Sequence, residues 1–415
     1  EKLNDKRSST LDKVTKSISS GTQTSANKIY IVVPQNADRI DPHDKGDSVT
    51  VVPLGENKEY EIEADLLRPW LQGIDVQRWR GDWAGQHVIF PYYIEENENS
   101  EPDPQLYCKK EMETKFPKTW DYFKQHEGKL RGRESGRWEN SDVWWEFGRP
   151  QNLEKFRLPK IINADMASHA RFMIDEDGLW HFKTPYGIYL EPDLQPHTDR
   201  VACLVNSKVL DFYLKHIAPM LLGGKYRYQS RYLGELPYID VQNGTIPKRL
   251  DKAVGPILNA LDTENKMDRF PEAYIGDYDG ELDYITYEWN TRRYPVSGEV
   301  QEDDDGDLTV QAGRSDIIKD SAMYSDDSKA QKNRAEYVLA AVDGRNIKSG
   351  EEMTIPIPRK DDGVAALLDR LETDRLEVQQ TNIPELEAQI DEAVYDLFDL
   401  IDDEREVIED YLEVF

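Results

Sequence analysis

The chain has 415 residues, enough for two or three domains with a buried core, and a formal net charge of −29 from 52 Lys+Arg against 81 Asp+Glu. The sequence has no apolar run of about 18 residues and no charged-then-apolar leader. It therefore predicts neither a membrane span nor a secretory signal, and we expect a cytoplasmic protein. The two cysteines, Cys108 and Cys203, exclude a disulfide scaffold and a cysteine-based zinc site.

The acidic charge is concentrated in the last part of the sequence. Residues 101–250 carry 23 Lys+Arg and 21 Asp+Glu, whereas residues 251–415 carry 17 and 43, a net charge of −26. One interpretation is a solvated or regulatory acidic tail. The other is adaptation of the whole protein to molar salt, which we favour because the acidic residues interrupt good helical patterns. In either case the near-neutral middle is where we expect an anionic partner.

The first half of the chain predicts mostly strands and short helices. Residues 1–26 are polar and indicate a linker or a frayed end. Strands are predicted over 29–33, 48–53 and 88–92, and a short helix is expected to stop at Arg68 because Pro69 follows. Helical spacing covers residues 111–133.

The second half begins with an expected β-hairpin over 171–182, whose turn would be Asp175–Gly178. An apolar helix face then spans 201–217, and a loop with aromatic and basic residues follows at 221–228. Residues 277–331 predict a long, partly mobile insertion with some strands. Apolar stripes over 364–378 and 383–401 indicate two helices, and a third closes the chain.

Motifs for common catalytic chemistry are missing. The sequence has no phosphate-binding GxxxxGK, no GxGxxG, no HExxH and no GxSxG. Three Glu-x-Lys triplets, which begin at Glu56, Glu113 and Glu264, are about as many as chance gives, so a magnesium-dependent nuclease is only a weak alternative. Asp303–Asp307 resembles half of a calcium loop, but Arg314 stands where the closing Glu would be. We therefore predict no catalytic and no metal-binding residue.

Aromatic and basic residues interleave in two segments of the middle region. Arg149, Gln151 and Asn152 form one group, and Lys225, Arg227 and Arg231 form the other. Arg reads guanine, Gln and Asn read adenine, and basic side chains hold phosphates. We expect Arg149 to read bases and Arg227 and Arg231 to hold phosphates. The alternative is that the aromatic residues are core and the arginines are solvated.

The order of several segments resembles a known family. Leu66–Trp79 is similar to the opening of the TaqI-like C-terminal specificity domain, the DNA target-recognition part of adenine-specific DNA methyltransferases. Matching segments follow in the family's order. They are residues 88–92, 116–126, 145–153, 159–162, 186–188, 204–208 and 232–237, and residues 390–400 resemble the C-terminal helix common in these proteins.

This resemblance implies an α+β fold: a mixed-sheet target-recognition domain followed by a C-terminal helical region. Its loops 68–80, 137–152 and 223–231 would face double-stranded DNA. The candidate DNA-binding residues are Arg68, Arg78, Arg80, Arg137, Arg149, Gln151, Asn152, Lys225, Arg227 and Arg231.

Four segments follow from the resemblance. They are an N-terminal connector over 1–63, the recognition domain over 64–250, an acidic, partly mobile insertion over 251–362 and a helical hairpin over 363–415.

The family's adenine-flipping enzymes close their pocket with an Asn/Asp-Pro-Pro-Tyr/Phe motif and bind S-adenosylmethionine on a Gly-rich turn. This sequence contains no Pro-Pro pair and no such turn. We therefore expect catalysis and the cofactor in a methyltransferase domain N-terminal to Glu1, in a salt-adapted restriction–modification or phage-defence enzyme. The alternative from another class is an interaction or scaffold protein with the same fold.

Overall fold

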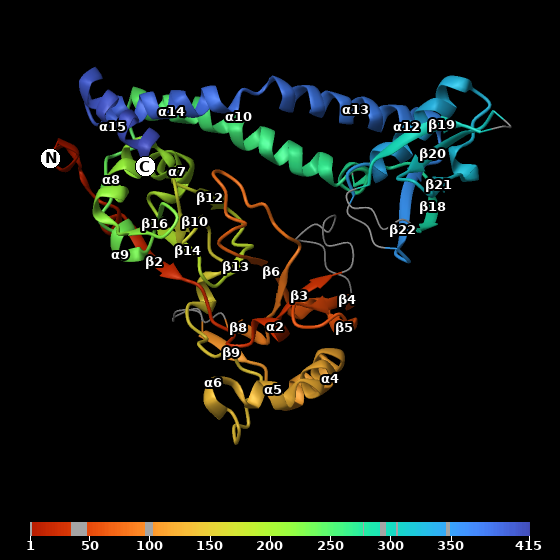
Figure 1. Cartoon of the computed structure of the whole chain (residues 1–415), viewed down its shortest axis with the longest axis horizontal. Coiled ribbons are helices and arrows are strands. Elements are labelled where there is room, and N and C mark those ends of the chain that lie inside the picture. Colours follow the sequence, from red (N-terminus) through yellow and green to blue (C-terminus); the bar gives the residue numbers. More distant parts are fainter. Residues whose placement is uncertain are drawn as a thin grey trace. The chain divides into compact units, whose positions relative to one another are not determined.

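The computed structural model describes residues 2–34, 48–95, 103–276, 278–290, 296–303, 306–345 and 349–415. The chain divides into two compact units (Figure 1). The first contains the described residues up to Ile257 together with Ile383–Phe415, and the second contains Leu258–Asn382. No helix in the described ranges is long and apolar enough to cross a membrane.

The largest sheet of the first unit has the strand order β13-β6-β7-β3-β4-β5. Its strands are β3 (Ile31–Pro34), β4 (Ser48–Pro53), β5 (Tyr60–Glu63), β6 (Leu67–Leu71), β7 (His87–Ile89) and β13 (His181–Phe182). Most neighbours are antiparallel, but β13 pairs with β6 in parallel. β-branched Val, Ile and Thr make up most of β3 and β4, and such residues are suited to a pleated, buried surface. Pro69 lies within β6, where a helix end was expected.

A second sheet has the order β12-β10-β14-β2, with β2 (Thr15–Ser20), β10 (Lys160–Asn163), β12 (Phe172–Asp175) and β14 (Tyr186–Leu190). The prediction of a linker or frayed end over 1–26 is therefore wrong, because β2 pairs with β14. Three of the six residues of β2 are Ser, which has no strand preference of its own, so this strand depends on pairing with β14 and cannot be recognised locally.

The predicted hairpin over 171–182 is also wrong, because its two strands belong to different sheets: β12 pairs with β10 and β13 with β6. The turn itself forms, since the Asp175 carboxylate accepts hydrogen bonds from the backbone N–H groups of Leu179 and Trp180. The buried ammonium of Lys160 pairs with the same carboxylate. The Lys160–Asp175 ion pair links the end of β12 to β10, whereas β13 pairs with β6 in the other sheet.

The remaining strands of the first unit form small sheets. The three-stranded sheet β11-β16-β15 contains β11 (Met166–Ala167), β15 (Met220–Leu221) and β16 (Lys225–Arg227). Two-stranded sheets join β1 (Ser9–Thr10) to β17 (Pro237–Tyr238) and β8 (Tyr92–Glu95) to β9 (Asp103–Leu106).

The helical stretch expected over 111–133 consists of consecutive short helices, α3 (Lys109–Lys115), α4 (Pro117–Gln125) and α5 (Glu127–Arg131). The face expected over 201–217 is also divided, into α7 (Thr198–Asn206) and α8 (Lys208–Ile217), because Ser207 is extended and caps α8. The unit's other helices are α1 (Lys2–Lys6), α2 (Asn27–Tyr30), α6 (Arg133–Gly136), α9 (Ser230–Leu233), α14 (Ile383–Leu397), α15 (Asp402–Val414) and the first part of α10 (Thr245–Asp268).

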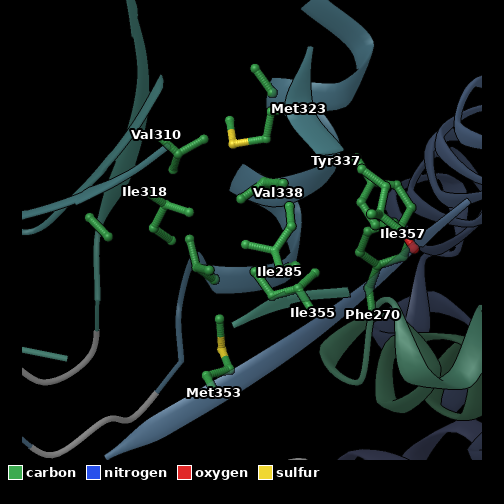
Figure 2. Close-up of a cluster of buried hydrophobic side chains, with 14 of the residues drawn as sticks. Phe270, Ile285, Val310, Ile318, Met323, Tyr337, Val338, Met353, Ile355 and Ile357 are labelled. Carbon is green, nitrogen blue, oxygen red and sulfur yellow. The ribbon is translucent and has the colours of Figure 1, made fainter. Parts of the chain in front are cut away.

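The second unit has its own apolar core despite its acidic composition. Strands β18 (Leu282–Glu288) and β22 (Glu352–Pro358) pair, and β19 (Gly298–Glu302), β20 (Leu308–Ala312) and β21 (Asp316–Ile318) form a second sheet. Figure 2 shows Ile285, Ile355 and Val338 directed toward one another. Helices α11 (Glu272–Ile275), α12 (Ser328–Val342) and α13 (Asp361–Gln380) complete the unit. Lys319 pairs with Asp303 and Asp307, while Asp304 and Asp305 lie outside the described residues.

Helices and largely antiparallel mixed sheets occur in separate stretches of the chain, and helices α13, α14 and α15 follow the last strand. The α+β class predicted from the sequence is confirmed.

Candidate nucleic-acid interface

A cleft of about 450 Å³ opens on the first unit. Its lining comes from β3, from β6 and the turn after it, from β11 and β16, and from the residues that follow β13. The lining residues used below are Asn27, Gln72, Ile74, Gln86, Asp165, Met166, Arg171, Lys183 and Lys225.

The parallel pair β6–β13 builds one part of the lining. Trp70 is in register with His181 and Leu71 with Phe182, so Gln72 and Lys183 follow at neighbouring strand ends. The turn after β6 is closed by Asp75, whose carboxylate accepts a hydrogen bond of 2.7 Å from the backbone N–H of Gln72. Burial raises the pKa of Asp75. The turn leaves the side chain of Ile74 75% exposed.

The sheet β11-β16-β15 builds another part of the lining. Strand β16 is its middle strand, and Tyr226 is in register with a residue of each neighbouring strand. Lys225, the residue before it, is in register with Leu221 of β15. Below it, Tyr226 and Tyr228 are buried, and the Tyr228 hydroxyl donates to Asp211. Arg227 pairs with Asp165 at 2.6 Å. These contacts fix the strand that presents Lys225.

The charges of the lining favour an anion. Arg171, Lys183 and Lys225 are basic, whereas the acidic Asp165 is already paired with Arg227. Within the described ranges, neither Lys183 nor Lys225 has a hydrogen bond or an ion pair through its ammonium group. The two long acid-free stretches of the sequence, residues 13–37 and 212–234, contribute Asn27 and Lys225 to this cleft.

Amide side chains provide neutral hydrogen-bonding groups in the cleft. Gln72 donates to Gln86 at 2.8 Å, and Asn27 also lines the cleft. Lys and Arg suit phosphate oxygens, and Gln and Asn suit the edges of adenine. No group of three or more His, Cys, Asp or Glu side chains in the described ranges is arranged to hold a metal ion.

The ten predicted DNA-binding residues do not gather at one place: Lys225 lines the cleft, and the other nine are not among its lining residues. Arg68 donates to the carbonyl oxygens of Asp65 and Leu67, and burial lowers its pKa. Arg80 pairs with Asp82 at 2.9 Å.

Three further arginines also have intramolecular contacts. Arg78 pairs with Glu387 at 3.2 Å. The guanidinium of Arg231 lies on the ring of Tyr232 at 4.3 Å, and that of Arg227 pairs with Asp165 as described above.

The predicted loop 137–152 is tied to the N-terminal segment. Gln151 donates to the carbonyl oxygen of Gly21, and Asn152 donates to that of Ser20. Arg137 lies over Trp138 and donates to the carbonyl oxygen of Gly148. Arg149 is exposed, and its guanidinium has no hydrogen bond or ion pair with the part of the chain that is described. The division of Arg149 and Arg227 between bases and phosphates stays a prediction.

Sequence reasoning missed five of the polar residues that line the cleft: Asn27, Gln72, Gln86, Arg171 and Lys183. Lys183 directly follows the apolar strand His181–Phe182, so a basic residue at a strand end was the available signal. The assignment of that strand to a local hairpin concealed its long-range pairing with β6, which brings Lys183 next to Gln72.

Comparisons with known proteins agree with a DNA-directed role for this region. The Type II methyltransferase M.BstVI of Geobacillus stearothermophilus is 25% identical over 225 residues, which cover 54% of this chain and 33% of the relative. The chain thus spans about a third of the length of that relative. Residues 68–238 match the profile of the TaqI-like C-terminal specificity domain, and Gln72, Arg171, Lys183 and Lys225 lie within them. The chain therefore contains a TaqI-like C-terminal specificity domain over residues 68–238.

Proposed function

We propose that this chain is the DNA sequence-recognition part of a site-specific adenine DNA methyltransferase of the restriction–modification or phage-defence type. The observation that carries the proposal is the basic cleft, most of whose lining residues lie in the matched specificity domain. Catalysis and S-adenosylmethionine binding belong, in this proposal, to a methyltransferase domain N-terminal to this chain. The missing Pro-Pro motif supports that division. A cytoplasmic location is part of the proposal, because the proposed DNA substrate would be met there.

The cleft's cations and amides have separate roles in this proposal. Arg171, Lys183 and Lys225 neutralise phosphates, which supplies affinity without sequence preference. Gln72, Gln86 and Asn27 are the candidates for reading base edges. The acid-free stretches around Lys225 and Asn27 lessen the repulsion that a chain of net charge −29 exerts on DNA.

The test is selection of duplexes from a random library by this chain, followed by binding measurements across a range of KCl concentrations. We expect one enriched sequence motif. Lys225→Ala should weaken binding to all sequences alike and lower the slope of log affinity against log salt by about one. Lys110→Ala, which removes an exposed lysine of α3, is the matched control and should leave that slope unchanged.

Three results would contradict the proposal in different ways. Absence of any duplex binding would favour the scaffold protein. Nicking of DNA that requires magnesium would favour the nuclease. Micromolar binding of S-adenosylmethionine to this chain in calorimetry would overturn the division between a recognition part and a separate catalytic domain.

A further inference from the structure

The tip of the β15–β16 hairpin carries an apolar side chain with no packing role. Leu222 is 100% exposed, and Met220 on the same hairpin is 56% exposed. Gly223 and Gly224 follow with φ of +82° and +69°, and a Cβ added at either would meet nothing within 4 Å. The tip therefore projects into open space, and burial of Leu222 in the folded chain contributes nothing to stability.

The base of the hairpin is rigid, in contrast to its tip. Met220 of β15 is in register with Tyr226, and Leu221 with Lys225. On the other side of β16, Arg227 is in register with Met166 of β11. The rings of Tyr226 and Tyr228 anchor the strand in the core. A projecting apolar residue on a fixed support can transmit force to a partner, whereas one on a free loop would yield.

The charge around the tip identifies the partner as a polyanion. No Asp or Glu occurs between Asp211 and Glu235, and the exposed cation nearest the tip in the sequence is Lys225. Two other cations of this interval are already paired, Lys215 with Asp211 and Arg227 with Asp165. Lys225, three residues from Leu222, lines the cleft. Two exposed apolar side chains, Ile74 at 75% and Met166 at 49%, line the same cleft. A hydrophobic tip beside cations suits duplex DNA, which offers phosphates outside and apolar base faces within.

We propose that Leu222 is a wedge that inserts into the base stack of bound duplex DNA, at the base pair that is opened for methylation. The inference rests on the proposed function. Opening a base pair costs the free energy of its stacking and pairing, and an apolar side chain in the gap offsets part of that cost. Leu222 is thus a positioning residue, because it acts on the stack and not on the reacting atoms.

The test uses the duplex selected by this chain, with the fluorescent adenine analogue 2-aminopurine placed at successive positions of the site. At saturating protein, we expect the wild type to raise the fluorescence several-fold at one position, where the stack opens. Leu222→Ala should abolish that rise and weaken binding about tenfold, as expected when a buried apolar contact is lost. Lys225→Ala should weaken binding but retain the rise at saturation.

The control for the side-chain change is Leu376→Ala, which truncates a 46% exposed leucine of α13 and should alter neither readout. Leu222→Ala and Leu376→Ala should both keep the wild-type melting temperature, so that a change in DNA binding is not a folding effect. Equal fluorescence and affinity for the wild type and Leu222→Ala would overturn the wedge and leave the proposed function standing. If the chain bound no duplex DNA, both proposals would fall.

Discussion

At the scale of single residues, Asp391 of α14 is a carboxyl group with little access to water, since the residue is 4% exposed. It accepts a hydrogen bond of 2.8 Å from the backbone N–H of Lys208, the first residue of α8. Burial raises the pKa of Asp391 to about 6, although that hydrogen bond and the charges of Arg78 and Lys208 act in the opposite direction. The residue holds two helices together at an electrostatic cost.

This cost predicts a pH-dependent effect of Asp391→Asn. A pKa above the unfolded value of about 4 means that the folded protein binds the proton more tightly, so ionised Asp391 lowers the unfolding free energy above about pH 6. Asparagine can keep the acceptor without the charge. We expect the variant to gain on the order of 2 kcal/mol at about pH 7.5, and the gain to vanish toward about pH 4.

Urea titrations of the wild type and the variant at both pH values measure this difference. Asp410→Asn, an exposed site on α15, controls for the loss of one negative charge and should show a small, pH-insensitive effect. An equal gain from Asp391→Asn at both pH values would mean that burial of the charge is not its cause.

At the scale of elements, α14 supplies the side chain that contacts Arg78 and Trp79, which follow the turn after β6. Trp79 has φ of +72°, an uncommon conformation for a bulky residue, and it is 4% exposed. Its indole N–H donates to Glu387 of α14 at 2.7 Å, and Arg78 pairs with the other oxygen of that carboxylate at 3.2 Å. The long-range contacts therefore maintain a backbone conformation that the local sequence disfavours.

We expect Glu387→Ala to lower the unfolding free energy by about 1–3 kcal/mol, because the buried indole N–H loses its acceptor. Glu387→Gln should lose less, since its amide oxygen can still accept from Trp79. The midpoint of urea unfolding measures both changes, and Glu406→Ala on α15 is the charge-matched control at an exposed site. If the Ala and Gln variants were equally stable, the indole hydrogen bond would contribute nothing.

At the scale of the whole molecule, like-charge repulsion is the dominant electrostatic feature. The net charge is −29, and residues 251–415 account for −26 of it. We propose that the protein is adapted to molar salt, where the Debye length is about 3 Å and repulsion is screened. The compact core of the second unit is consistent with a folded acidic surface.

The corresponding prediction is a melting temperature that rises from dilute buffer to molar KCl. Sorbitol at matched osmolality is the control, because it is excluded from protein surfaces without screening charge. A flat or falling melting temperature in KCl would instead support the acidic-tail interpretation.

Local pattern alone determined the C-terminal helices with apolar stripes, whereas the α+β class was implied by the family resemblance. The spacing of Val364, Leu367 and Leu371 predicts α13, and all three side chains are buried. The stripe that begins at Ile383 predicts α14 in the same way. Such stripes are readable because a helix satisfies its backbone hydrogen bonds within itself, so the sequence needs to encode only which face is buried.

Only the tertiary structure decided the strand partners and the composition of the cleft. The pairing of β13 with β6 places Lys183 and Gln72 at neighbouring strand ends. Strand β2 pairs with β14 although its segment has no apolar periodicity. A strand's hydrogen bonds go to another strand, and nothing in its own residues names that strand. For the same reason the sequence identified Lys225 as a basic residue in a basic segment, while the fold decided that Lys225 faces the cleft and that Arg227 pairs with Asp165.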